Sequence, residues 1–129
     1  MLQNGIRHYQ SVERESLSGR ETEARVLTQA ALKLIDCQNN WDADDRKHRL
    51  DEALQYNQKI WSIFQAEISN PDNPLPNEIK INLLNLSRFI DKRIIETMTS
   101  PSPEKLRIII RINQNIAAGL RGSPSGSIN

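Results

Sequence analysis

The sequence predicts an all-α fold, a small bundle of about four helices with a proline-rich turn between the second and the third. Apolar residues recur at three- and four-residue steps, which places them on one face of a helix. Residues 70–76 hold Pro71, Pro74 and Pro76, and proline stops a helix because it locks φ and lacks a backbone donor. A short connection between two amphipathic helices favours antiparallel neighbours, so we expect a helical hairpin around this turn.

The composition points to a single domain without a strong charge. The 129 residues hold 17 Lys and Arg against 16 Asp and Glu, and a net charge of +1 gives no field for gathering nucleic acid or anionic lipid. The single cysteine, Cys37, excludes an internal disulfide and a Cys-based zinc cluster. No apolar run approaches the roughly 20 residues that cross a bilayer, and the N-terminus lacks the apolar core of a signal peptide, so we expect a cytoplasmic protein without a membrane span.

The N-terminal third is expected to hold an arm and the first helix. Residues 1–17 are polar and aperiodic and predict a flexible N-terminal arm, with a frayed terminus as the alternative. The helix should begin near Ser18, because Ser18 and Glu21 form a capping box in which each side chain satisfies the other's free backbone donor. An alanine- and leucine-rich stripe follows, with Glu23 on the face toward water, and the turn-forming residue Asn39 should mark the end.

The second helix should start among residues 40–45, where three aspartates stabilise the positive end of the helix dipole. This acidic run lacks the glycine and the terminal glutamate of a calcium loop, so a solvated helix start is expected. The proline turn then separates two apolar stripes, formed by Leu50, Leu54, Ile60, Trp61, Phe64 and Ile68 before it and by Ile79, Leu83, Leu86, Ile90 and Ile94 after it.

The last helix is harder to predict, because the run LRIIIRI is rich in β-branched residues and could pass for a strand. Ser102 as a cap, Pro103 at the first helical position and helical apolar spacing up to Leu120 favour a helix. Ile108 and Ile112 fall outside the main apolar stripe. This helix is therefore either central in the bundle or offers apolar surface to a partner.

Motifs for catalysis are missing from the chain. It has no glycine-rich phosphate loop and no Gly-x-Ser-x-Gly elbow. His8 and His48 lack a cysteine or a second histidine at ligand spacing, and Asp44 with His48 fits an exposed charge cluster. Cys37 has no histidine beside it and fits an inert thiol. We therefore expect no enzyme, no catalytic residue, no cofactor and no metal site.

Two candidate binding surfaces remain. Trp61 and Phe64 lie three residues apart, and they either fill the core or line a groove that accepts an apolar helix. The candidate protein-binding residues are Trp61, Phe64, Leu83, Leu86, Ile108 and Ile112. Basic residues on the last two helices could contact phosphates, but no aromatic residue interleaves for base stacking, and solvated helix faces explain them equally. These alternative nucleic-acid-binding residues are Arg88, Lys92, Arg93, Lys105, Arg107 and Arg111.

Several stretches taken together resemble one protein family. They are Asn57-x-x-Ile60-Trp61-x-x-Phe64, Pro71-Asp72-Asn73-Pro74-Leu75-Pro76, Asn82-Leu83-Leu84-x-Leu86-Ser87-x-Phe89 and the ending INQNIAAGL at 112–120. In this combination the chain is similar to the flagellar biosynthesis regulator FlaF family over about residues 9–120. The family often has an arginine at the position of Gln114.

The resemblance implies a cytoplasmic, non-enzymatic regulator of flagellum biosynthesis that is required for flagellin synthesis and secretion, with a FlaF-like helical domain at 18–120. It implies a protein partner, either flagellin, held in a chaperone-like way, or the FlbT-type regulator that acts at flagellin messenger RNA. Nucleic acid is not expected as a direct partner. Direct RNA-binding regulation of flagellin messenger RNA stays open as an alternative, as does a homodimer or adaptor that buries its extra apolar face. Residues 121–129 are rich in Gly, Ser and Pro and predict a disordered tail.

Overall fold

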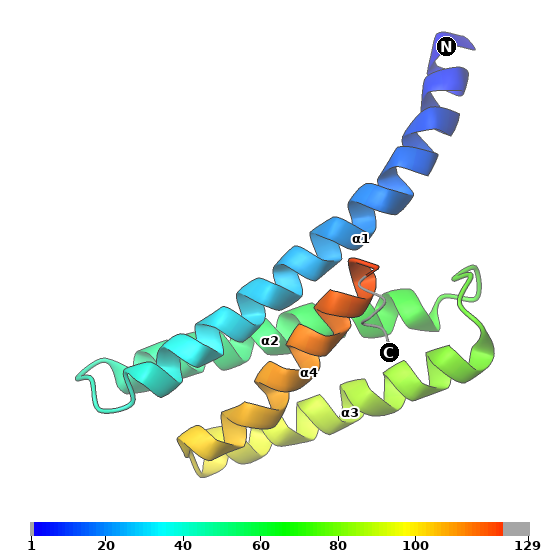
Figure 1. Cartoon of the computed structure of the whole chain (residues 1–129). Helices are drawn as coiled ribbons and strands as arrows, with labels where there is room; N and C mark the ends of the chain where they lie inside the picture. The colour runs from blue at the N-terminus through cyan, green and yellow to red at the C-terminus, as the bar shows by residue number, and fades with distance from the viewer. Residues whose placement is uncertain (1, 123–129) are drawn as a thin grey trace.

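A computed structural model describes residues 2–122 of the chain and the side chains of residues 19–122, and over that part every regular element is helical. The predicted all-α fold is therefore confirmed, and the isoleucine-rich run is helical (Figure 1). The elements are α1 (Leu2–Asn39), α2 (Arg46–Ser69), α3 (Asn77–Thr99), the short 3-10 helix η1 (Pro103–Lys105) and α4 (Leu106–Leu120). Within this part, none of the helices combines the length and the apolarity required to cross a bilayer.

The first helix is longer than the sequence predicted. α1 begins at Leu2, so the capping box at Ser18 lies inside the helix and does not start it. The chain has no proline before Pro71, and the two glycines of this segment weaken a helix without breaking it. Residues 2–17, predicted as an arm, form the part of α1 that extends away from the other helices (Figure 1). The predicted tail lies almost wholly outside the described residues, which end at Gly122.

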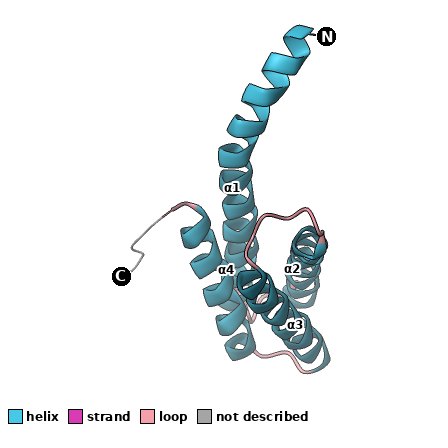
Figure 2. Cartoon of the chain, turned by 90° about the vertical axis from the view of Figure 1, so that its right-hand side faces the viewer, coloured by secondary structure: helices cyan, strands magenta, loops and turns pink. Residues whose placement is uncertain are grey.

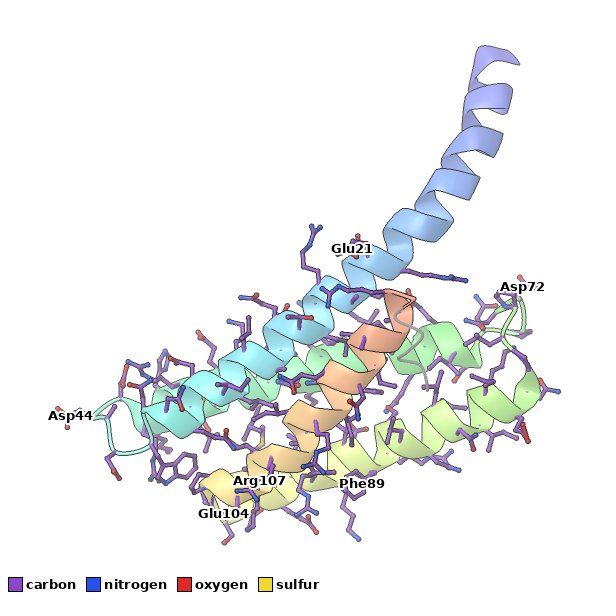
Figure 3. All side chains as sticks on the ribbon, viewed as in Figure 1. Glu21, Asp44, Asp72, Phe89, Glu104 and Arg107 are labelled. Carbon is purple, nitrogen blue, oxygen red and sulfur yellow. The ribbon has the colours of Figure 1, made fainter. Side chains whose placement is uncertain are left out.

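Two turns at opposite ends of the bundle join the first three helices, one carrying Asp44 and the other Asp72 (Figure 3). Two asparagine side chains of the proline turn form hydrogen bonds with its backbone. The side-chain oxygen of Asn70 accepts from the Asp72 amide at 2.9 Å, and that of Asn73 accepts from the Leu75 amide at 3.0 Å. These are the local bonds that make asparagine favourable in turns.

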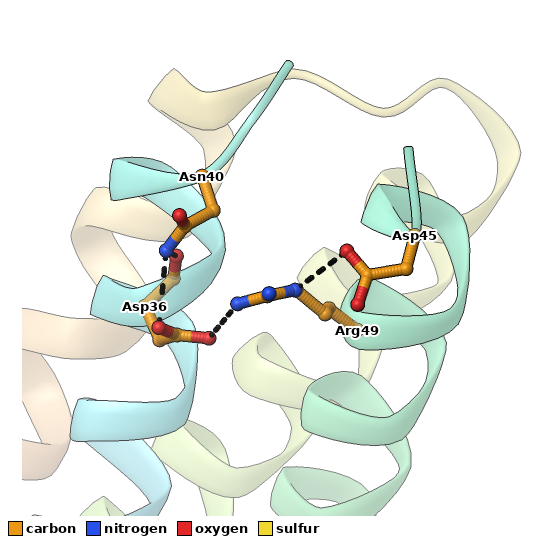
Figure 4. Close-up of polar contacts among 4 residues, drawn as sticks. All are labelled: Asp36, Asn40, Asp45 and Arg49. Carbon is orange, nitrogen blue, oxygen red and sulfur yellow. Dashed lines mark hydrogen bonds and ion pairs between the residues drawn. The ribbon is translucent and has the colours of Figure 1, made fainter. Parts of the chain in front are cut away.

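The turn between α1 and α2 is tied by Arg49 (Figure 4). Its guanidinium contacts the Asp36 carboxylate at 3.0 Å and the Asp45 carboxylate at 2.7 Å, which joins the end of α1 to the start of α2. The hydrogen bond from Arg49 lowers the pKa of Asp45. α2 thus begins directly after the predicted aspartates, although Asp45 makes no side-chain bond to the helix backbone. Ser102 likewise makes no capping bond, and Pro103 begins η1.

The helices pack around one core. α1 packs mainly on α4 and α2, and α3 packs mainly on α2 (Figure 2). Three small side chains, Ala24, Ala30 and Ala31, are buried on α1 and let the neighbouring helices approach closely. The larger buried side chains of the core are Leu27, Leu34, Leu50, Leu54, Trp61, Ile90, Ile94, Leu106 and Ile109.

A chain of hydrogen bonds crosses this core. Trp61 Nε1 donates to Asn113 Oδ1 at 2.9 Å, and Asn113 Nδ2 donates to Asn57 Oδ1 at 2.6 Å. Asn57 Nδ2 in turn donates to the carbonyls of Ala53 at 2.8 Å and Ala30 at 3.2 Å. The three side chains are almost completely buried, and their polar atoms are paired, as buried polar groups must be. This network, which we call the core polar chain, joins α4, α2 and α1.

Candidate functional site

A surface groove of about 390 Å³ opens beside the core, between α1, α2, the proline turn, the start of α3 and the end of α4. Its lining is mostly apolar, and it includes the two carboxylates Glu23 and Glu67. The lining residues are Gly19, Arg20, Glu23, Leu27, Trp61, Phe64, Glu67, Ile68, Asn73, Pro74, Leu75, Leu83, Ile116 and Leu120. We refer to this set as the groove.

Helix geometry explains how these residues meet. On α1, Gly19, Glu23 and Leu27 follow at four-residue steps, so they stand on one face. On α2, Phe64 and Ile68 are likewise one turn apart. The proline turn then sends α3 back along α2 and brings the start of α3 to the same side. The groove therefore depends on the hairpin that the prolines create.

The structure brings three of the six predicted protein-binding residues into the groove. Trp61, Phe64 and Leu83 line it. The other three lie elsewhere: Leu86, Ile108 and Ile112 are half-buried and pack against the core. Ile108 and Ile112 thus make α4 apolar on more than one face, because its flanks also contact the rest of the bundle.

Trp61 forms the floor of the groove and belongs to the core at the same time. Its side chain is 1% exposed, and its indole nitrogen donates to Asn113. Phe64 stands against it edge-on, with ring centroids 5.8 Å apart and an interplanar angle of 88°. Phe64 is only half-buried, so it offers the aromatic surface of the groove that a partner can reach.

The carboxylates of the groove escaped the sequence prediction. Glu23 was expected to face water, but it is half-buried in the groove. Burial raises the pKa of Glu23, a hydrogen bond with Glu67 and the charge of Glu67 raise it further, and the charge of Arg20 opposes them. No local pattern in the sequence could have shown this pairing, since Glu67 belongs to another helix.

A second apolar surface lies on α3, outside the groove. Phe89 belongs to this surface (Figure 3). The Arg93 guanidinium lies 5.5 Å from the Phe89 ring centroid and 3.7 Å from the Glu96 carboxylate. The large exposed side chains of α3 are Ile79, Ile81, Phe89, Ile95 and Met98.

The predicted basic residues are distributed over two helices. Arg88 and Lys92 are exposed on α3, and Arg107 and Arg111 are exposed on α4, whereas Arg93 and Lys105 are half-buried. Lys105 donates to the carbonyl of Ser100. Of the six, only Arg93 stands over an aromatic ring in the described part of the chain.

The remaining side chains that could react or bind a metal are Cys37, Asp44 and His48. Cys37 is buried, and burial, followed by the negative charge of Asp36, raises the pKa of its thiol. Asp44 and His48 are both exposed. Among the described side chains, those of residues 19–122, no group of three or more His, Cys, Asp or Glu is arranged to hold a metal ion.

Comparison with known proteins gives one match. A family described as flagellar protein FlaF matches residues 6–120, which include every residue of the groove, nearly all of α1 and the whole of α2, α3 and α4. No curated protein and no solved structure matches the chain.

Proposed function

The chain belongs to the FlaF family of flagellar proteins, and from this premise we propose that it regulates flagellum biosynthesis by holding a segment of another polypeptide in the groove. Flagellin is the first candidate partner and a FlbT-type regulator is the second. We also propose that the protein acts in the cytoplasm, before flagellin is exported, and without a catalytic step. The role in flagellar biosynthesis comes with the family, and the mode of binding is our proposal.

One observation carries the proposal. The groove combines a fixed aromatic floor, Trp61, with the half-buried aliphatic and aromatic side chains of Phe64 and Leu83. An amphipathic helix binds such a groove through apolar side chains at one-turn intervals, and aromatic anchors in desolvated pockets contribute most of the affinity. A flagellin segment held in this way would be protected from aggregation, and the occupied protein could report how much flagellin awaits export.

The test is a titration of the purified full chain with purified flagellin and with purified FlbT-type regulator, read by calorimetry. The double variant F64A/L83A removes the reachable apolar surface, so we expect the affinity for the true partner to fall about tenfold or more. The matched control is I81A/I95A on α3, where both side chains are 57% exposed and lie outside the groove. Urea unfolding of each variant shows whether it remains folded.

Three results would overturn the proposal. A folded F64A/L83A protein with unchanged affinity would exclude the groove as the site. A loss confined to I81A/I95A would place the partner on α3. If binding collapsed between low and moderate salt and involved flagellin messenger RNA, the basic residues would be the site, because phosphate contacts depend steeply on salt and apolar contacts do not.

A further inference from the structure

The groove carries an electrostatic feature that an apolar pocket does not need. Its charged side chains are Arg20 and Glu23 from α1 and Glu67 from α2. Within residues 19–122 neither Glu23 nor Glu67 takes part in a salt bridge. The arginine at the end of α4, Arg121, is engaged beside the groove, where it lies 3.6 Å from the Glu21 carboxylate and donates to the hydroxyl of Thr28.

The two carboxylates line the same groove, whose walls are mostly apolar. Glu67 is exposed at its edge, whereas Glu23 is partly shielded from water. Glu23 is already half-buried, and its pKa is raised by that burial and by Glu67. A purely apolar partner would remove water from the carboxylates without supplying a hydrogen bond or an opposite charge, which costs free energy. A partner cation would instead form charge-assisted hydrogen bonds with both.

We propose that the groove selects an amphipathic helix that carries a lysine or arginine at the edge of its apolar face, with the cation placed between Glu23 and Glu67. This inference rests on the proposed function and specifies the chemistry of its partner. The apolar residues of the helix face Phe64 and Leu83, and the cation faces the carboxylates. A helix with an acidic residue at the same position is rejected, because a third negative charge would enter the groove.

The experiment uses two synthetic helical peptides of about three turns that have identical leucines. One carries a lysine beside the leucine face and the other a glutamine at that position. We expect the full-length protein to bind the lysine peptide about tenfold more tightly. In the variant E23Q/E67Q this preference should fall below about twofold. The matched control E21Q removes a carboxylate of the same helix that lies outside the groove, and it should keep the preference.

Proton linkage gives a second readout. A cation beside Glu23 favours its charged form and lowers its pKa, so the lysine peptide should release protons as it binds at a pH near that pKa. The glutamine peptide removes water from Glu23 without supplying a charge and should cause proton uptake. Calorimetry in buffers with different ionisation enthalpies measures whether protons are released or taken up. Neither release nor uptake should be seen in E23Q/E67Q.

The failure of this inference can be told apart from the failure of the proposed function. Equal binding of both peptides, weakened in both by F64A/L83A, would overturn the charge preference and leave the groove as the binding site. Proton uptake with the lysine peptide would also overturn it. If F64A/L83A left the binding of both peptides unchanged, the groove itself would be excluded, and both proposals would fall.

Discussion

Replacing Asn113 with leucine tests whether the core polar chain holds the bundle together. Leucine branches at Cγ as asparagine does, but it can neither accept nor donate a hydrogen bond. The substitution removes the acceptor of the Trp61 indole, which lies 2.9 Å from Asn113 Oδ1. It also removes the donor to Asn57 Oδ1, which lies 2.6 Å from Asn113 Nδ2. Asn57 keeps the bonds that its own amide donates.

The expected loss follows from the groups left without partners. The indole N–H of Trp61 and the side-chain oxygen of Asn57 are left without partners, and neither residue is more than 1% exposed. Each unsatisfied buried group costs about 1–3 kcal/mol, so N113L should lower the free energy of unfolding by about 2–6 kcal/mol. Since domains of this size are stable by about 5–15 kcal/mol, this is a large share of the total.

Urea unfolding followed by far-ultraviolet circular dichroism measures the loss, provided the slope against urea is unchanged. The control is N115L, which puts leucine on an exposed site of α4 and should stay within about 0.5 kcal/mol of the parent protein. In the background W61F the indole donor is absent, so N113L should cost less there, by about 1 kcal/mol or more. If N113L matched N115L in stability, the core polar chain would not hold the helices together.

Three smaller effects follow from other contacts. R49A removes the link between α1 and α2, but its ion pairs are solvent-exposed, so the free energy of unfolding should fall by much less than in N113L, and by less still in high salt. A fall as large as that of N113L in urea unfolding would contradict this. Cys37 is buried with a raised pKa, so iodoacetamide should modify it at least about tenfold more slowly in the native protein than in urea, and equal rates measured by mass spectrometry would show an open site. Because the folded-state pKa of Glu23 is raised above 4.5, Glu23 contributes stability below that value and loses this contribution as the pH rises through the raised pKa. E23Q should therefore flatten the fall of the urea midpoint with pH, and an unchanged pH profile would refute the raised pKa of Glu23.

The sequence predicted the helices wherever their ends depend on local chemistry. The proline turn and the asparagines at the end of α1 interrupt the helical pattern directly, and the structure places breaks there. The predicted start of α1 was wrong because no residue there interrupts the helix. Ser18 and Glu21 can cap a helix, but they do so only if the preceding residues leave the helical conformation, and nothing in residues 2–17 compels them to leave it.

The candidate site was predicted in part. Phe64 and Leu83 were found because apolar spacing marks the inner face of a helix hairpin. Glu23 and Glu67 were missed because a glutamate next to an apolar stripe has the same pattern whether it faces water or a groove. The distinction depends on which helix lies opposite, and that depends on tertiary packing. Asn57 and Asn113 were missed as a pair for the same reason.

The core polar chain and the groove share one residue, and this links stability to binding. Trp61 is the floor of the groove, and its ring is held by the hydrogen bond from its indole nitrogen to Asn113 and by the T-shaped contact with Phe64. An indole fixed in this way does not have to be ordered when a partner arrives, and preorganisation of this kind lowers the entropic cost of binding. The half-buried walls at Phe64 and Leu83 contribute no hydrogen bond to the core polar chain, so their chemistry can be changed while the floor stays in place. The residues that fix the fold and the residues that choose the partner are therefore largely separate, and Trp61 is the point where they meet.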